Sequence, residues 1–252
     1  MKTLVTANQK GGVGKTATLV HIAFDFLERG LKVAVIDLDT QANASHTLKA
    51  FTSSFCASTL FSSVPSGFYS QTALDARMVL IESDVGLANM EKMPLQEAGK
   101  NFRESIKTLE KQGFDVCLID TAPSLGVSLA AALLAADYVL SPVELEIYSI
   151  QGIKKIIMTI ANIRKANPKL QFLGMVPSKV DGRNPRHRRH LEELQRVYPT
   201  LIIPVSIGLR SSIADALASC VPVWRIKKTS ARRATQEVRE LAAQVFKKME
   251  IA

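Results

Sequence analysis

Short apolar runs recur along the chain and are separated by longer amphipathic stretches. Runs of this length suit strands, and their nearly continuous apolar character is typical of strands covered on both faces of a sheet. The predicted strands are Leu4–Ala7, Val33–Asp37, Met78–Ile81, Val116–Asp120, Tyr138–Leu140, Phe172–Val176 and Leu201–Val205. Because helical stretches lie between most of these strands, the pattern predicts an α/β fold with a doubly wound, mostly parallel sheet flanked by helices.

Several of the intervening stretches have a helical period. Apolar residues recur at helical spacing in Thr16–Arg29 and Ser149–Asn167, and both stretches predict helices. The stretch Ala234–Met249 is amphipathic with polar groups on its other face, so we expect it to pack on the sheet and not on a membrane. By contrast, Thr52–Arg77 is rich in Ser, Pro and Gly, and it predicts a surface excursion with one short helix.

Length and composition indicate one globular domain. The chain has 252 residues, of which 47% are hydrophobic, and we expect residues 1–252 to form a single domain with no N-terminal helix-turn-helix domain. The three cysteines have no C-x-x-C spacing, and the N-terminus lacks an apolar signal segment. Both features fit a reducing cytosol, so the sequence predicts a cytoplasmic protein.

The net charge of +9 is unevenly distributed. Residues 1–150 carry 12 Lys/Arg and 16 Asp/Glu, whereas residues 151–252 carry 20 Lys/Arg and 7 Asp/Glu. A basic half of this kind indicates either a polyanion-binding face or a solvated basic surface, and we favour binding to nucleic acid. No base-reading motif accompanies the charge, which favours sequence-independent binding to double-stranded DNA. The candidate DNA-binding residues are Arg183, Arg186, Arg188, Arg189, Lys227, Lys228, Arg232 and Arg233.

A glycine-rich turn lies between the first predicted strand and the first predicted helix. Backbone N–H groups of such a turn point inward, and the helix dipole favours an anion there. The turn predicts a phosphate cradle in which Lys15 reaches the β- and γ-phosphates and the Thr16 hydroxyl holds Mg²⁺. Its residues are Lys10, Gly11, Gly12, Val13, Gly14, Lys15 and Thr16.

Carboxylates follow two of the predicted strands. Asp37 and Asp39 are two residues apart and project to one side of the chain, and Asp120 ends another apolar strand. Open α/β sheets bind ligands at the carboxyl ends of their strands. We therefore expect Asp39 to face Mg²⁺ and an attacking water, and Asp120 to contribute to the water shell of the metal.

The glycine-rich turn departs from the usual P-loop. Gln9 stands where glycine is usual, and a second lysine, Lys10, begins the loop. This arrangement resembles the "deviant" Walker A box, K-G-G-x-G-K-[ST], of the ParA/MinD ATPases. Met1–Leu19, Gly113–Ser124 and Gly208–Pro222 are especially similar to the IncC branch of the ParA partition ATPases. The resemblance implies that Lys10 reaches the nucleotide of a partner subunit across a dimer interface.

The same resemblance assigns roles to residues outside the P-loop. It implies that Asp39 orients the attacking water, that Glu146 contacts the ribose or the interface, and that Pro204 and Ser206 lie near adenine. Two positions depart from the family pattern. Thr40 replaces a proline, and Ala17 replaces a hydroxyl residue that touches the α-phosphate, which should weaken nucleotide binding by about 1 kcal/mol.

The resemblance implies an ATPase switch for plasmid segregation. An ATP- and Mg²⁺-bound sandwich homodimer would bind nonspecific DNA of the nucleoid, and a centromere-binding ParB-type partner would stimulate hydrolysis and release. The residues expected to act in catalysis are Lys10, Lys15, Asp39 and Asp120. The alternatives are a MinD-like membrane-positioning ATPase, a noncatalytic nucleotide-dependent DNA scaffold, and a nitrogenase-iron-protein-like reductase, which would need two cluster cysteines per subunit.

Overall fold

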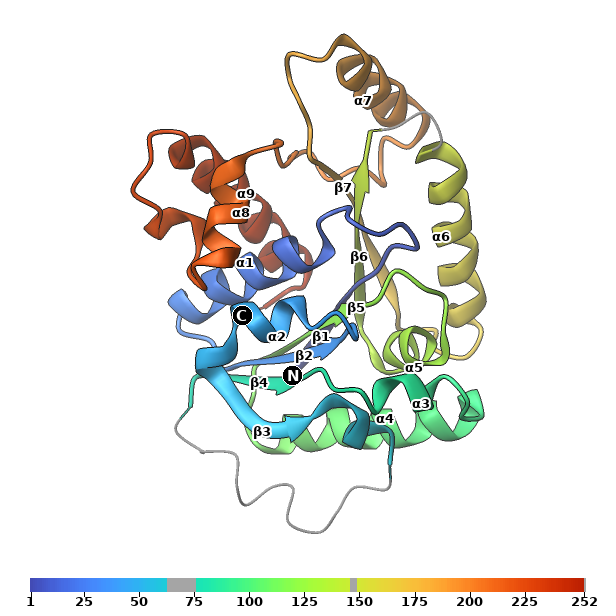
Figure 1. The fold of residues 1–252 in the computed structure, drawn as a ribbon. Helices are drawn as coiled ribbons and strands as arrows, with labels where there is room; N and C mark the ends of the chain where they lie inside the picture. Colours follow the sequence, from blue (N-terminus) through green and yellow to red (C-terminus); the bar gives the residue numbers. More distant parts are fainter. Residues whose placement is uncertain (63–75, 146–148, 252) are drawn as a thin grey trace.

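A parallel sheet forms the centre of the molecule (Figure 1). The computed structural model describes residues 1–62, 76–145 and 149–251. Within these ranges the sheet has seven strands in the order β3-β4-β2-β5-β1-β6-β7, and every pair of neighbours is parallel. The strands are β1 (Lys2–Thr6), β2 (Val33–Leu38), β3 (Thr52–Cys56), β4 (Met78–Glu82), β5 (Val116–Thr121), β6 (Tyr138–Glu144) and β7 (Gln171–Ser178). The predicted fold class is confirmed.

Helices cover both faces of this sheet. The helices are α1 (Lys15–Glu28), α2 (Asn43–Thr47), α3 (Leu87–Met90), α4 (Leu95–Lys111), α5 (Val127–Ala135), α6 (Ser149–Arg164), α7 (Pro185–Val197), α8 (Ser211–Ala218) and α9 (Ala231–Lys248). Short 3₁₀ turns are η1 (Lys49–Phe51), η2 (Ala57–Phe61) and η3 (Val223–Arg225).

Successive strand residues enter two separate cores. Leu4 packs in a core with residues of α1, α8 and α9, whereas Val5 packs in a core with residues of α4, α5 and α6. Figure 1 shows these two groups of helices on opposite sides of the sheet. This alternation explains why the strands are apolar at nearly every position, because both faces are buried.

The centre of the sheet brings three strand ends together. β5 lies between β1 and β2, and the ladder pairs Asp37 of β2 with Asp120 of β5. The turn from β1 into α1 leaves the sheet at the same edge. The carboxyl ends of β1, β2 and β5 therefore surround one point, which is where the predicted site residues meet.

The predicted strand Leu201–Val205 is not formed as a strand. The segment approaches β7 through two backbone hydrogen bonds of Met175, of 2.6 and 2.8 Å, and makes a single bridge between Met175 and Ile202. The next bond of such a parallel ladder would run from the N–H of residue 177 in β7 to the Ile203 carbonyl, but Pro177 has no N–H, and this limits the pairing to one bridge.

The prediction for Thr52–Arg77 was wrong at its start. This stretch begins with the edge strand β3, which pairs with β4, and continues into the 3₁₀ turn η2. β3 has the sequence Thr-Ser-Ser-Phe-Cys and carries little of the apolar pattern of the inner strands. Its register on β4 is also irregular between Thr52 and Cys56. Residues 63–75 lie outside the described residues.

The start of α7 is marked by an asparagine cap and a proline. α7 starts at Pro185, and the Asn184 side chain caps it by accepting a 3.0 Å hydrogen bond from the Arg186 N–H. Proline at the first helical position after an asparagine cap is a strong start signal. Three of the candidate DNA-binding arginines consequently lie on the first turns of a helix and not in a loop.

The apolar face of α9 is buried, as predicted. Val238, Leu241, Val245 and Met249 pack in the core shared with α1. In the described part of the chain, none of the helices has both the length and the apolar character needed to cross a bilayer.

Polar contacts fix α9 and η3 to α1. The Arg239 guanidinium pairs with Asp25 and Glu28 and stacks 3.6 Å from the Trp224 ring centroid. His21 Nδ1 donates to the Ala17 carbonyl over 2.7 Å, and its Nε2 accepts a hydrogen bond from the Val223 N–H over 3.2 Å. Because His21 is almost fully buried, its pKa falls from 6.5 to about 4.

The buried imidazole predicts an acid-sensitive contribution to stability. Between about pH 4 and pH 6.5 the unfolded chain protonates His21 and the folded chain does not, so stability falls as the pH is lowered through this range. From pH 7.5 to pH 4, the free energy of unfolding of the wild-type chain should fall by on the order of 3 kcal/mol more than that of His21→Gln. Urea unfolding of both proteins at several pH values across this range measures this difference. A wild-type-minus-variant difference that does not change with pH would refute the assignment.

Candidate nucleotide-binding site

The loop between β1 and α1 is a cradle of backbone groups. The Asn8 side chain anchors its start, because Asn8 Nδ2 donates to the Pro142 carbonyl of β6 over 2.7 Å. Gly12 and Gly14 have φ of +75° and +90°, a conformation that side chains disfavour. A Cβ on Gly14 would also lie 2.8 Å from Ser178 Oγ. Position 14 therefore favours glycine for two reasons: its positive φ and the close approach of Ser178.

Thr16 and Asp120 meet at the base of this cradle. The Thr16 hydroxyl donates to Asp120 Oδ2 over 2.5 Å, and the Thr6 hydroxyl donates to Asp120 Oδ1 over 3.1 Å. Burial and the nearby Asp37 carboxylate raise the pKa of Asp120 to about 7, although the two hydroxyl groups oppose the shift. A hydroxyl oxygen beside a carboxylate is a donor set that fits Mg²⁺, which prefers oxygen ligands and keeps several waters or phosphate oxygens.

Lys15 lies within the loop and is only 6% exposed. Its ammonium is 3.5 Å from the Lys10 carbonyl oxygen. Burial lowers the pKa of Lys15, and the carboxylates of Asp120 and Asp39 oppose that shift by favouring the charged form. A buried cation in a glycine-rich loop at a helix N-terminus is suited to bind phosphate.

The two acids at the end of β2 have different surroundings. Asp37 is fully buried and accepts hydrogen bonds from the Ser45 N–H (2.8 Å), the Ser45 hydroxyl (2.7 Å) and the Asp39 N–H (3.0 Å). Asp39 lines the cavity described below, and its Oδ1 accepts from the Gln41 N–H over 3.0 Å. Asp37 thus supports the loop, which leaves Asp39 as the acid that faces a ligand.

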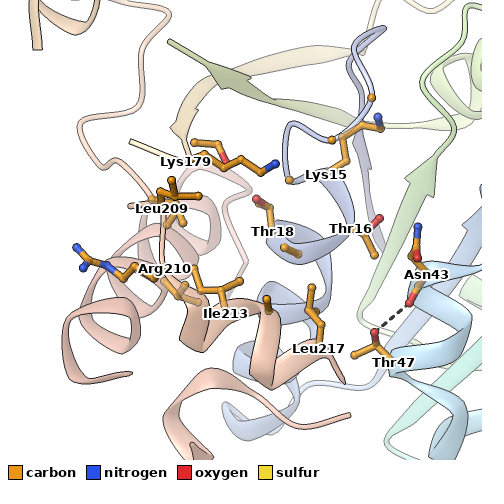
Figure 2. Close-up of a pocket in the computed structure, with 18 of the residues that line it drawn as sticks. Lys15, Thr16, Thr18, Asn43, Thr47, Lys179, Leu209, Arg210, Ile213 and Leu217 are labelled. Carbon is orange, nitrogen blue, oxygen red and sulfur yellow. Dashed lines mark hydrogen bonds between the residues drawn. The ribbon is translucent and has the colours of Figure 1, made fainter. Parts of the chain in front are cut away.

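A cavity of about 690 Å³ extends from the P-loop along α1 (Figure 2). One end has the charged and backbone groups of the cradle, and Asp39 lines it as well. The other end is apolar and is lined from α1, α8 and α9 by Ile22, Ile213, Ala214, Leu217, Val238 and Leu241. A cavity with one anion-binding end and one apolar end suits a ligand that joins a phosphate tail to an aromatic base.

The wall opposite α1 comes from a loop that the sequence analysis missed. Ile207, Gly208, Leu209 and Arg210 line the cavity, and α9 holds this loop through Glu237. Glu237 Oε2 accepts from the Gly208 N–H over 3.0 Å, and its carboxylate pairs with the Arg210 guanidinium over 2.9 and 2.5 Å. No apolar period marks these residues, so their role depends on the three-dimensional arrangement.

The structure also places Thr18, Ser178 and Lys179 on this cavity, and the sequence analysis did not name them as site residues. One signal was present for the last two. Ser178 ends β7 and Lys179 follows it directly, so both stand at the carboxyl edge of the sheet where ligands bind. Thr18 follows Ala17 by one residue on the first turn of α1 and brings a hydroxyl group to the cavity wall.

The remaining predicted residues are distributed around this site. Gly11, Gly12, Gly14, Lys15, Thr16, Ala17 and Asp39 line the cavity. Val13 is buried and can contribute only its backbone, and Lys10 pairs with Glu144 over 2.7 Å. Pro204 and Ser206 do not line the cavity, whereas Ile207 and the residues after it do. Glu146 lies outside the described residues.

The candidate DNA-binding residues form two exposed groups on different helices. One group surrounds the start of α7 and comprises Arg183, Arg186, Arg188 and Arg189. The other group lies before and on the first turn of α9 and comprises Lys227, Lys228, Arg232 and Arg233. Acidic neighbours partly neutralise each group, since Arg183 pairs with Asp181 in the first group, and Lys228 pairs with Asp215 and Arg233 with Glu237 in the second.

The parallel sheet, the glycine cradle and the Thr16–Asp120 contact define a P-loop nucleotide-binding fold. Residues 1–172 match the AAA domain family. The chain is 67% identical to Protein IncC of Escherichia coli, over 100% of this chain and 71% of that protein. It is 31% identical to the chromosome-partitioning ATPase Soj of Thermus thermophilus, over 73% of this chain and 71% of Soj.

Among solved structures, a cobyrinic acid a,c-diamide synthase from Mycobacterium smegmatis with bound ADP and magnesium has a similar fold. Its TM-score is 0.77 at 25% identity, over 98% of this chain and 94% of that one. The chain belongs to the AAA domain family and, within it, to the ParA-type partition proteins that include IncC.

Proposed function

We propose that the chain is a plasmid partition ATPase that binds Mg²⁺ and ATP, dimerises in that state and then binds DNA without sequence preference. A ParB-type centromere-binding partner stimulates hydrolysis, and the subunits leave the DNA. The observation that carries this proposal is the contact between Thr16 and Asp120 at the base of the glycine cradle, next to Lys15. The identity of 67% to IncC supports the partition role.

The residues of the site have distinct parts in this proposal. Thr16 and Asp120 hold Mg²⁺, which neutralises charge on the phosphates when it is bound. Lys15 stabilises the negative charge of the transferred phosphoryl group, and Asp39 positions the attacking water. Lys10 contributes its ammonium to the nucleotide of the partner subunit. Catalysis is then mostly electrostatic and positional, as is general for phosphoryl transfer.

The apolar end of the cavity serves the base of the nucleotide. Ile213, Leu217 and Val238 line this end and offer contact area to a flat ring. A nucleotide in this cavity would lie between α1 on one side and α8 with α9 on the other. Because α9 also begins with the basic residues Arg232 and Arg233, nucleotide and DNA contact the same helix at different points.

Exposed arginine and lysine side chains support the DNA-binding part of this function. Both basic groups are exposed, and the half of the chain that contains them has a net charge of +13. Such residues neutralise phosphates and release counterions, so binding weakens steeply as salt is raised.

A co-sedimentation assay with double-stranded DNA tests this function. We expect binding with Mg²⁺ and ATP, and little binding with ADP or without nucleotide. The affinity with ATP should fall steeply between 50 and 200 mM salt, and a variant with Arg186→Ala and Arg189→Ala should weaken binding and reduce the salt slope by about 2.

The control for this assay removes the same charge from another surface. Lys165→Ala with Lys169→Ala changes two exposed lysines that precede β7, at the edge of the sheet opposite the cavity. This variant should bind DNA like the wild-type chain. Equal DNA binding with ATP, with ADP and without nucleotide would refute the proposed switch.

A further inference from the structure

A carboxylate lies between two lysines at the mouth of the cavity. Glu144, at the end of β6, is 2.7 Å from Lys10 Nζ through Oε2 and 3.3 Å from Lys179 Nζ through Oε1. The Glu144 side chain is 17% exposed, and those of Lys10 and Lys179 are 47% and 44% exposed. Burial alone would raise the pKa of Glu144, but the two lysines lower it, so the carboxylate stays ionised.

The backbone at Lys179 is strained. Its φ is +54°, in the left-handed region that non-glycine residues rarely adopt. The flanking chain enforces this conformation, because the Val180 N–H donates to Ile207 over 3.0 Å and the Leu209 N–H donates to Val180 over 3.0 Å. Strain of this kind persists only where the surrounding structure fixes the residue, and the residue fixed here lines the cavity.

The Lys179 ammonium lies over the P-loop. It is the atom nearest to a Cβ built on Gly12, at 3.9 Å, and Figure 2 shows the side chain extending toward the loop that carries Lys15. Lys179 and Gly12 line the same cavity. An anion seated on the backbone N–H groups of the loop would therefore come within reach of this third ammonium.

We propose that Lys179 is a phosphate-binding residue of this site and that the nucleotide displaces the Glu144 carboxylate from it. The proposal rests on the proposed function, because it takes a nucleotide as the ligand. A lysine ammonium is a compact charge with three donors and a flexible stem, so it can exchange one oxygen partner for another without a change in the fold. Glu144 keeps the ammonium ordered near the loop before binding, and it also competes with the phosphate for that ammonium.

This exchange predicts opposite effects for the two partners. Lys179→Met keeps the length of the side chain and removes its charge, and it should weaken binding of ATP with Mg²⁺ about tenfold. Glu144→Gln removes the competing charge and should strengthen binding about threefold. In the double variant the gain from Glu144→Gln should disappear, because no ammonium remains at Lys179 to be released.

Calorimetric titration of the full chain with ATP and Mg²⁺ measures these affinities. Lys165→Met, which removes an exposed lysine before β7, is the matched control and should bind like the wild-type chain. Thermal melting checks that each variant is folded. Lys179→Gln provides a second neutral variant that should reproduce the loss seen with Lys179→Met.

The outcomes separate this inference from the proposed function. If the wild-type chain does not bind ATP, the proposed function fails. If the wild-type chain binds and Lys15→Ala does not, but folded Lys179→Met and Lys179→Gln both bind like the wild type, only the present inference is overturned. A gain from Glu144→Gln that persists in the double variant would show that Glu144 acts through Lys10 alone, and it would also overturn the inference.

Discussion

Replacing Lys15 with alanine is expected to weaken binding of ATP with Mg²⁺ by at least about 100-fold and to abolish ATP-dependent DNA binding. Lys15 is buried in the P-loop, where water cannot replace its ammonium as a partner for phosphate. Its charge is kept in place by Asp120 and Asp39 although burial lowers its pKa. Calorimetric titration measures the first effect, and DNA co-sedimentation with ATP measures the second.

A matched exposed lysine controls for the loss of charge. Lys107 is on α4, where it pairs with Glu104 on the surface, and Lys107→Ala should bind nucleotide and DNA like the wild-type chain. The melting temperature of Lys15→Ala should not fall greatly, since the substitution removes a desolvated cation from the protein interior. ATP-dependent DNA binding by folded Lys15→Ala would contradict the proposed cycle.

The second large effect is expected at Asp39. Asp39→Asn should keep the affinity for ATP within about threefold and lower the hydrolysis rate about 100-fold. Asparagine retains an oxygen that can accept from the Gln41 N–H, so the loop is preserved, but it removes the negative charge that orients an attacking water. Phosphate release in the presence of a ParB-type partner protein measures hydrolysis, and calorimetry measures binding.

A substitution at the neighbouring Asp37 separates a role in hydrolysis from a role in holding the loop. Asp37 accepts hydrogen bonds from Ser45 and from the Asp39 backbone, so Asp37→Asn should lower the melting temperature, whereas Asp39→Asn should not. Wild-type hydrolysis by Asp39→Asn would rule out its role in placing water. If the wild-type chain itself releases no phosphate even with the partner, a nucleotide-dependent DNA scaffold becomes the better description.

The inner strands were predictable because their sequence pattern follows from burial on both faces. β2 and β5 are apolar until the acids at their ends, and the predicted bounds differ from the structure by only one residue. β3 was missed because an edge strand has one neighbour and needs fewer apolar residues, and its Thr-Ser-Ser start carries no such pattern. The prediction of a strand at Leu201–Val205 failed for another reason, since apolar character alone does not supply the N–H that Pro177 lacks in the neighbouring strand β7.

Site residues could be predicted from the sequence where one short segment contains both a strand end and a chemically functional side chain. The P-loop and the acids after β2 and β5 are such segments, and the parallel sheet brings them together at one edge. Glu144 and Lys179 could not be paired in this way. Glu144 ends β6 and Lys179 follows β7, and only the β6–β7 register places Glu144 opposite Ser178, one residue before Lys179.

The central position of β1 has a consequence for synthesis on the ribosome. β1 is made before the other strands described, but its neighbours β5 and β6 begin at Val116 and Tyr138. More than a hundred residues after β1 must therefore leave the exit tunnel before β1 can pair with β5 or β6. Parallel pairing over such sequence separations is slow. A nascent chain that ends before β5 has the P-loop glycines and Lys15 but no Asp120 beneath them, so the ligand pocket cannot be completed until β5 has emerged.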